Sequence, residues 1–554
     1  MTAEFRHIHK TGVSARPDAG AWGPRTAAVL PTAVVVLISL LLFSRLSAGT
    51  ALVASERPDL TWLWCLVVGL PTLAFAGVGY AGMERFARRF CRAATMFLLV
   101  YFATEPFFMP RPGLEEGSFV LWFHQNGRWI GLGLAALGWL RPAFVFAGAM
   151  VLWMLRDLNP VATGMYFSNL DIRNTVEAIS FVVIGQVLVS AVAGLTPVAT
   201  ALGLHEANMR ARARIGVIAA SIGGHFSSYF LSAIAKLSLN GGPLSWLLDN
   251  RFEHIVLGAL ERGSFPWAAW PAVTDAVYTG LAWVSVPLNV TAFAVQAAAL
   301  IAPIRLRWLI GLTALYDLFH LTVYLVAGLL FWKWMALNTV FLVTLVALRQ
   351  DRPDLWDRSA KTICLAFVLV GGLWFRIAFL AWYETPAFVS PYIEAETESG
   401  TTHRVPPAYF GISSYQVSQG WLHVPDNTRH FPFCVWGSCH DYGSVLRRRA
   451  CDLPEKPTSQ AQRPVPLDQV RAWMADHHEN VVEAAGADGI WNYFLYLHHH
   501  MPSPFTNMDF YRLDKRKIAE YRLVLESVCL SLENGRLQRD VRLRDSFSLY
   551  EVSE

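Results

Sequence analysis

The sequence predicts an all-α polytopic membrane bundle followed by a soluble α+β domain. Of its 554 residues, 54% are hydrophobic and only 16% are charged, and the apolar residues come in blocks of membrane-spanning length. These blocks recur from residue 27 to residue 383, after which charged residues, His, Pro and Asn become frequent. The chain therefore divides into a short segment 1–26, a membrane domain 27–383 and a terminal domain 384–554, which is long enough to fold by itself.

The apolar blocks predict about 10 to 12 membrane spans. Two blocks are ambiguous. Residues 128–156 contain an Arg141-Pro142 break and form either one kinked helix or a tight hairpin, and residues 268–302 are interrupted at Pro287 and form either one helix or two. The candidate spans are 27–47, 60–82, 94–110, 128–156, 174–196, 213–237, 268–302, 308–330, 332–348 and 360–383.

Basic residues predict the orientation, because Lys and Arg concentrate in cytoplasmic loops. They place the N-terminal segment, the loop after the second span and the loop before the last span in the cytoplasm, so the terminal domain lies outside. The sequence thus predicts a multi-pass membrane protein with a cytoplasmic N-terminus. The net charge of +4 is too small to favour nucleic acid as a partner. The basic residues are Arg6, Lys10, Arg16 and Arg25; Arg85, Arg88, Arg89 and Arg92; and Arg349, Arg352, Arg358 and Lys361.

Four of the seven cysteines lie in the terminal domain: Cys434, Cys439, Cys451 and Cys529. An even number of cysteines outside the cytoplasm predicts disulfides, although four allow three pairings. The same region offers metal-ligand types, namely Cys434, Cys439 and His440 with His498 to His500. Their spacing lacks the second ligand pair of a zinc module, so we favour disulfides with surface histidines and predict no metal site.

One helical stripe of polar residues crosses the apolar block 213–240. His225, Tyr229, Ser232 and Lys236 follow one another at spacings of four, three and four residues, which places them on one face of a helix. Ionisable groups inside a membrane span are costly and mark functional sites. A lysine ammonium taken out of water gives up its proton more readily, so Lys236 is a candidate general base. Tyr229 and His225 would orient substrate or relay protons. The alternative is structural: Lys236 extends to the membrane edge, and the others bond to neighbouring helices.

A second polar face lies at residues 316–334. Tyr316, His320 and Tyr324 follow at intervals of four, and Asp317 stands three residues before His320. We expect Asp317 to fix the tautomer of His320, and Asp317, Tyr324 and Ser232 to bind substrate. The alternative is that His320 is purely structural and forms its hydrogen bond with a carbonyl group.

These residues resemble the HTTM domain of vitamin K-dependent gamma-carboxylase and its bacterial relatives, over roughly residues 170 to 350. The resemblance implies that Lys236, which stands before Leu237, is the base that deprotonates a hydroquinone. The cofactor, unknown from the residues alone, would then be a reduced quinone-like lipid. The matched positions are Ala233 to Leu237, Pro303, Arg305, Arg307, His320, Gly328, Phe331 and Trp332.

The side of the membrane on which Lys236 lies depends on the two ambiguous blocks. One span at 128–156 with two spans at 268–302 places Lys236 toward the cytoplasm. The carboxylase performs its chemistry on the lumenal side, which corresponds to the periplasm. If the span count of only one of these blocks is changed, Lys236 moves to the outer side, but one group of basic residues then lies on the wrong side of the membrane.

The terminal domain shows signs of both helix and strand. Its aromatic-rich run 409–443 predicts β-structure, residues 465–486 predict a helix, and residues 510–552 predict a helix or strand followed by an Asn534-Gly535 turn and final strands.

Three functions remain open. The first is an integral-membrane enzyme in which Lys236 acts on a lipophilic substrate, with His225, Tyr229 and His320 around it. The second is a proton-coupled transporter whose charged residues line a path. The third is a non-catalytic assembly factor that binds an exported protein; in all three, membrane lipids are partners. The enzyme hypothesis predicts that Lys236 and His320 face the same cavity.

Overall fold

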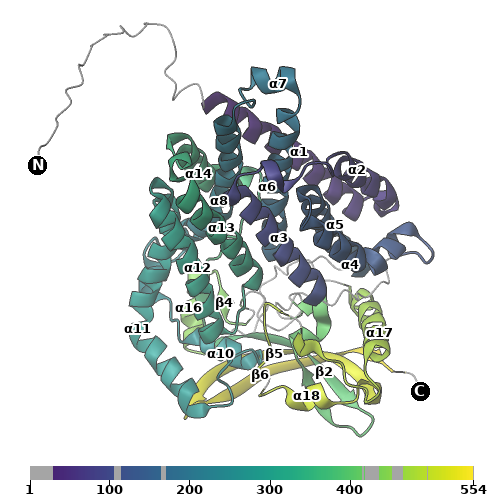
Figure 1. The fold of residues 1–554 in the computed structure, drawn as a ribbon. Helices are drawn as coiled ribbons and strands as arrows, with labels where there is room; N and C mark the ends of the chain where they lie inside the picture. Colours follow the sequence, from purple (N-terminus) through teal and green to yellow (C-terminus); the bar gives the residue numbers. More distant parts are fainter. Residues whose placement is uncertain are drawn as a thin grey trace, which may run out of the picture.

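A computed structural model describes residues 29–104, 114–163, 170–414, 417, 434, 436–451, 466–495, 497–503 and 505–552. Segment 1–26 with its basic residues, and most of the aromatic-rich run 409–443, lie outside the described residues. Figure 1 shows the helices of the first two-thirds of the chain gathered in a bundle, with the strands of the terminal domain beneath it.

In the described residues, fourteen α-helices precede the first strand. Five helical stretches are long and apolar enough to cross a membrane: Leu30–Ser55, Ile172–Ala193, Ala207–Leu237, Pro271–Leu300 and Leu306–Ala327. These five helices support the prediction of a membrane protein, whereas the predicted total of about 10 to 12 spans is not shown. The helices are α1 (Val29–Ser55), α2 (Thr61–Ala74), α3 (Arg85–Thr104), α4 (Phe119–Gly138), α5 (Pro142–Thr163), α6 (Leu170–Ala193), α7 (Thr196–Ala201), α8 (Ala207–Leu237), α9 (Ser245–Asp249), α10 (His254–Glu261), α11 (Pro271–Ala297), α12 (Leu306–Ala327), α13 (Trp332–Asp351) and α14 (Arg358–Val370).

The block 128–156 belongs to two helices. Helix α4 ends at Gly138 and α5 begins at Pro142, where the fixed φ of proline suits the first position of a new helix. The hydroxyl of Tyr80 donates a hydrogen bond to the carbonyl of Gly138 at 2.6 Å. This bond satisfies a backbone acceptor at the end of α4, so the tight hairpin is the alternative that forms.

The block 268–302 forms one long helix. Helix α11 runs from Pro271 to Ala297 and passes through Pro287 without a break. The Thr291 hydroxyl donates to the Pro287 carbonyl at 2.8 Å, which adds a local bond beside the residue that lacks an N–H. The second alternative for this block, two spans, is therefore wrong.

Helix α8 lies in the middle of the bundle and packs against α14, α6, α1 and α11. Gly223 permits the approach of α14, because a Cβ atom there would lie 2.3 Å from the carbonyl oxygen of Cys364. Most of α8 is buried as a result, including the stripe that carries His225 and Lys236.

The terminal domain contains a four-stranded antiparallel sheet in the order β3-β2-β5-β6. Asn534 and Gly535 both have positive φ in the turn between β5 and β6, so the predicted Asn-Gly hairpin is confirmed. Helix α17 confirms the helix predicted at 465–486. The elements are β2 (Ala387–Thr397), β3 (Thr402–Val405), β5 (Ile518–Glu533), β6 (Arg536–Glu551), the short pair β1 (Tyr383–Glu384) and β4 (Ser438–Cys439), and the helices α16 (Tyr442–Arg449), α17 (Leu467–Ala484) and α18 (Met508–Arg512).

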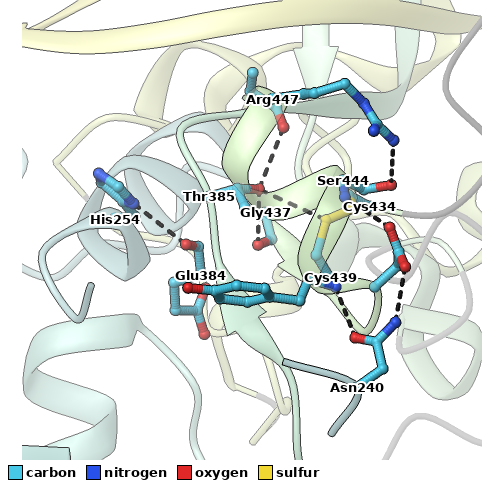
Figure 2. Close-up of a disulfide and its surroundings, with 12 residues drawn as sticks. Asn240, His254, Glu384, Thr385, Cys434, Gly437, Cys439, Ser444 and Arg447 are labelled. Atoms are coloured by element: carbon cyan, nitrogen blue, oxygen red, sulfur yellow. Dashed lines mark hydrogen bonds between the residues drawn. A yellow bond between two sulfur atoms is a disulfide. The ribbon is translucent and has the colours of Figure 1, made fainter. Parts of the chain in front are cut away.

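The four cysteines of the domain form two disulfides, Cys434–Cys439 and Cys451–Cys529, which confirms that they pair. Figure 2 shows the first bridge beside the loop that carries Glu384 and Thr385. There the Thr385 hydroxyl donates to the carbonyl of Gly437 at 3.1 Å. The bridge therefore supports the segment that leads from the bundle into the sheet.

The sheet is fastened to the bundle by a buried carboxylate of α10. Glu261 is paired with Arg404 of β3 at 3.1 Å and with Arg539 of β6 at 2.8 Å, and it accepts a hydrogen bond from Ser390 of β2 at 2.6 Å. One acid thus joins three strands to helix α10, which lies between α8 and α11 in the chain.

Candidate functional site

A cavity of about 100 Å³ lies where α8, α11, α12 and α13 meet the segment that enters β1. Both Lys236 and His320 line it, so the prediction that they face one cavity is confirmed. Its polar lining also includes Tyr229, Ser232, Gln296 and Glu384, and its apolar lining includes Trp246, Phe319, Phe331 and Trp334.

Lys236 is only 5% exposed. Its Nζ donates to Gln296 Oε1 at 2.9 Å and to the carbonyl of Leu380 at 2.5 Å, and it lies 4.9 Å from the centre of the Trp246 ring. In the described residues, no carboxylate lies within salt-bridge distance of this nitrogen. All of its neighbours there are uncharged, namely oxygen acceptors and an aromatic ring.

His320 is joined to α8 through Tyr229. The Tyr229 hydroxyl lies 2.9 Å from His320 Nε2 and accepts a hydrogen bond from Asn338 Nδ2 at 3.1 Å. The Tyr229 ring is stacked on Tyr316, with ring centres 3.7 Å apart. The other ring nitrogen of His320, Nδ1, is buried and has no hydrogen-bond partner in the described part of the chain. His320 is therefore held in this network through Nε2.

His225 supports this network and does not line the cavity. Its Nε2 lies 2.9 Å from Asn338 Oδ1, and its Nδ1 lies 2.9 Å from Asn174 Oδ1. Both ring nitrogens are thus occupied by side-chain amides. His225, expected to orient substrate or relay protons, therefore lies away from the cavity and is linked to Tyr229 through Asn338.

Asp317 and Tyr324 do not line the cavity. Asp317 Oδ2 accepts a hydrogen bond from Thr339 of α13 at 3.3 Å, and no bond joins it to His320. The expectation that Asp317 fixes the His320 tautomer is therefore corrected: the carboxylate is turned to the neighbouring helix. Ser232, by contrast, lines the cavity, and its hydroxyl accepts a hydrogen bond from the backbone N–H of Leu380 at 2.9 Å.

Glu384 is a site residue that the sequence analysis did not single out. It is 5% exposed and lines the same cavity as Lys236. Burial raises the pKa of this carboxyl to about 7, while the hydrogen bond from Trp382 Nε1 at 2.6 Å and the charge of Arg262 lower it in part. Its place directly after the last apolar block was visible in the sequence. Its contact with the cavity was not, because Asn250 and β4, which hold its backbone, lie far away in the chain.

The potential metal ligands of the terminal domain are separated or bridged where the structure describes them. Cys434 and Cys439 are bridged to each other, and no group of three or more His, Cys, Asp or Glu residues in the described ranges is placed to hold a metal ion. The triplet His498 to His500 is buried, which corrects the expectation that these histidines lie on the surface.

Comparison of the chain with protein-family models, curated proteins and solved structures finds no match.

Proposed function

We propose that the protein is an integral-membrane enzyme, similar to vitamin K-dependent gamma-carboxylase, in which Lys236 is the general base. The observation that supports this most is the position of Lys236 in a cavity shared with His320 and without a carboxylate partner. The neutral amine takes a proton from an acidic O–H or C–H group of the substrate. His320 and Tyr229 orient that group through hydrogen bonds.

The lining of the cavity fits a lipophilic ring. Trp246, Phe319 and Trp334 contribute aromatic faces, and the polar atoms are confined to a few side chains. A cavity of about 100 Å³ accommodates a ring-sized group but not a whole lipid. A reduced quinone-like lipid fits if its ring lies in the cavity and its tail runs out between helices. Such a quinol would supply an acidic hydroxyl and reducing electrons.

The helix count supports an orientation that agrees with every group of basic residues. We place α1, α2, α3, α4, α5, α6 and α8 as seven successive spans before Lys236, and α11, α12, α13 and α14 as four after it. With the N-terminus in the cytoplasm, seven crossings bring Lys236 to the outer side, and four more leave the terminal domain there as well. Arg305 and Arg307 then fall on the cytoplasmic side, as the positive-inside rule requires. On this assignment, Lys236 lies on the outer side without contradicting any group of basic residues, because block 128–156 counts as two spans and block 268–302 as one.

Labelling of cysteines in intact cells tests this orientation. A membrane-impermeant thiol reagent should label Ser399→Cys, which is exposed in the terminal domain, and should not label Gln350→Cys, which is exposed at the end of α13. The reverse pattern would contradict the assigned sides.

The enzymatic proposal is tested with the full-length protein in lipid nanodiscs. A reduced naphthoquinol serves as the probe, and oxygen uptake and fixation of labelled bicarbonate are measured. Lys236→Ala should abolish turnover, whereas Lys361→Ala, a lysine of α14 that does not line the cavity, should leave it intact. Accumulation of the quinol inside sealed vesicles without chemical change would favour a transporter instead.

A further inference from the structure

Helices α3 and α13 pack against each other in opposite directions. At one end, Arg85 Nη1 lies 3.1 Å from Asp351 Oδ1. At the other end, the rings of Phe97 and Trp332 lie 5.9 Å apart. The beginning of α3 therefore stands beside the last turns of α13 (Figure 1).

A groove between these two helices has a basic end and an apolar wall. Its volume is about 390 Å³, with Arg85 and Arg89 on the α3 side. A second cavity of about 190 Å³ shares these two arginines and is completed by Arg88 and Arg92. Part-exposed apolar side chains form the wall on the α13 side: Leu342, Val343 and Val346.

The basic end carries more positive charge than its neighbours neutralise. Arg85 has the only carboxylate partner of the four arginines among the described residues, and that pair lies at the surface. Arg88 Nε is buried, and no hydrogen-bond acceptor contacts it among the residues that the structure describes. The residue before Arg85, Glu84, is held by Arg214 at 2.5 Å. Because Arg85 and Arg88 also stand in the first turn of α3, where the helix dipole disfavours positive charge, a bound anion would stabilise this end.

We propose that the groove between α3 and α13 binds an anionic phospholipid. The phosphodiester lies against Arg85 and Arg89, and one acyl chain runs along Leu342, Val343 and Val346. Basic pockets between membrane helices bind anionic head groups in this way. The apolar wall selects a lipid over a free phosphate ion, which would gain nothing from contact with Val343 or Val346. This site is separate from the cavity of Lys236 and depends only on the chain spanning a membrane.

The experiment measures lipid retention by native mass spectrometry of the full-length protein. The protein is moved from nanodiscs of phosphatidylglycerol, or of phosphatidylcholine, into detergent. Wild type should retain one phosphatidylglycerol and no phosphatidylcholine. Arg85→Gln/Arg89→Gln should weaken retention about 30-fold, since each basic group near the surface contributes about 1 kcal/mol. Arg349→Gln/Arg358→Gln, which removes two exposed arginines outside the groove, should retain the lipid.

Two further measurements separate the lipid from other anions. Val346→Trp fills the apolar wall without changing the charge and should reduce retention of phosphatidylglycerol. Inorganic phosphate at millimolar concentration should not displace the lipid from wild type. The proposal would be overturned if both arginine double variants lost phosphatidylglycerol equally, or if wild type retained phosphatidylcholine. It would also be overturned if phosphate displaced the lipid from wild type and Val346→Trp retained the lipid as well as wild type does. The two lipids and the phosphate are compared on wild type, so the test holds even if a variant fails to fold.

Discussion

Lys236 Nζ lies 2.9 Å from Gln296 Oε1, a contact that joins α8 to α11 inside the cavity. The partner is a neutral amide where a carboxylate of the same length would fit. This choice matters because a carboxylate would stabilise the charged ammonium and so prevent it from acting as a base.

Gln296→Glu therefore should lower turnover while the protein stays folded. The new carboxylate pairs with Lys236 and holds its proton, so we expect a loss of at least about 10-fold in kcat. Turnover of the naphthoquinol and the melting temperature in detergent are measured together. Full activity with an unchanged melting temperature would show that the charge of Lys236 does not matter.

Tyr229→Phe should weaken both the fold and the site. The lost hydroxyl leaves His320 Nε2 and Asn338 Nδ2 without their shared partner, and each unsatisfied buried group costs about 1–3 kcal/mol. We expect a lower melting temperature and a fall in turnover. Tyr324→Phe is the control, because the Tyr324 side chain does not line the cavity. Equal effects of the two variants would argue against the network.

Glu384 should make the stability of the protein depend on pH. Its pKa is raised by burial from 4.5 to about 7 in the folded state, so between these values the folded chain binds more protons than the unfolded chain. The contribution of Glu384 therefore falls as the pH rises from 4.5 to about 7, by about 3 kcal/mol in all. The melting temperature of wild type is measured across this range and compared with that of Glu384→Gln, which should lose this component of the slope. An identical slope in the two proteins would contradict the assignment.

The two disulfides should differ in their contribution to stability. Cys451–Cys529 closes a separation of 78 residues and Cys434–Cys439 one of five. Loop-closure entropy gives about 4.5 kcal/mol for the first and about 2 kcal/mol for the second. The melting temperature of Cys451→Ser/Cys529→Ser should therefore be lower than that of Cys434→Ser/Cys439→Ser. The opposite order would show that local contacts outweigh chain entropy.

Short sequence patterns predicted the features that depend on neighbouring residues in the chain, such as the face of a helix or the type of a turn. The stripe of α8 follows from helical spacing, and the Asn534-Gly535 hairpin follows from the tolerance of these residues for positive φ. The cysteine count predicted bridges, but their partners came only from the fold. Proline was less informative: Pro142 begins a new helix and Pro287 lies inside one, because the surrounding packing decides between the two outcomes.

Residues brought together by tertiary structure could not be predicted. Glu384 lines the cavity, and its backbone is held both by Asn250 and by the pairing of β1 with β4, which lies more than fifty residues later. Gln296 and Trp246 approach Lys236 from separate helices. Asp317 has the spacing to contact His320, yet it bonds to Thr339 on another helix, since the direction of a side chain is set by its neighbours.

Rescue of Lys236→Ala by a small amine tests the central claim most directly. Naphthoquinol turnover is measured for wild type, Lys236→Ala and Lys236→Arg in nanodiscs, with and without added methylamine. If Lys236 is the base, both variants are inactive, methylamine restores Lys236→Ala, and Lys236→Arg stays inactive because its guanidinium remains protonated. Turnover retained by either variant without the amine would contradict the account.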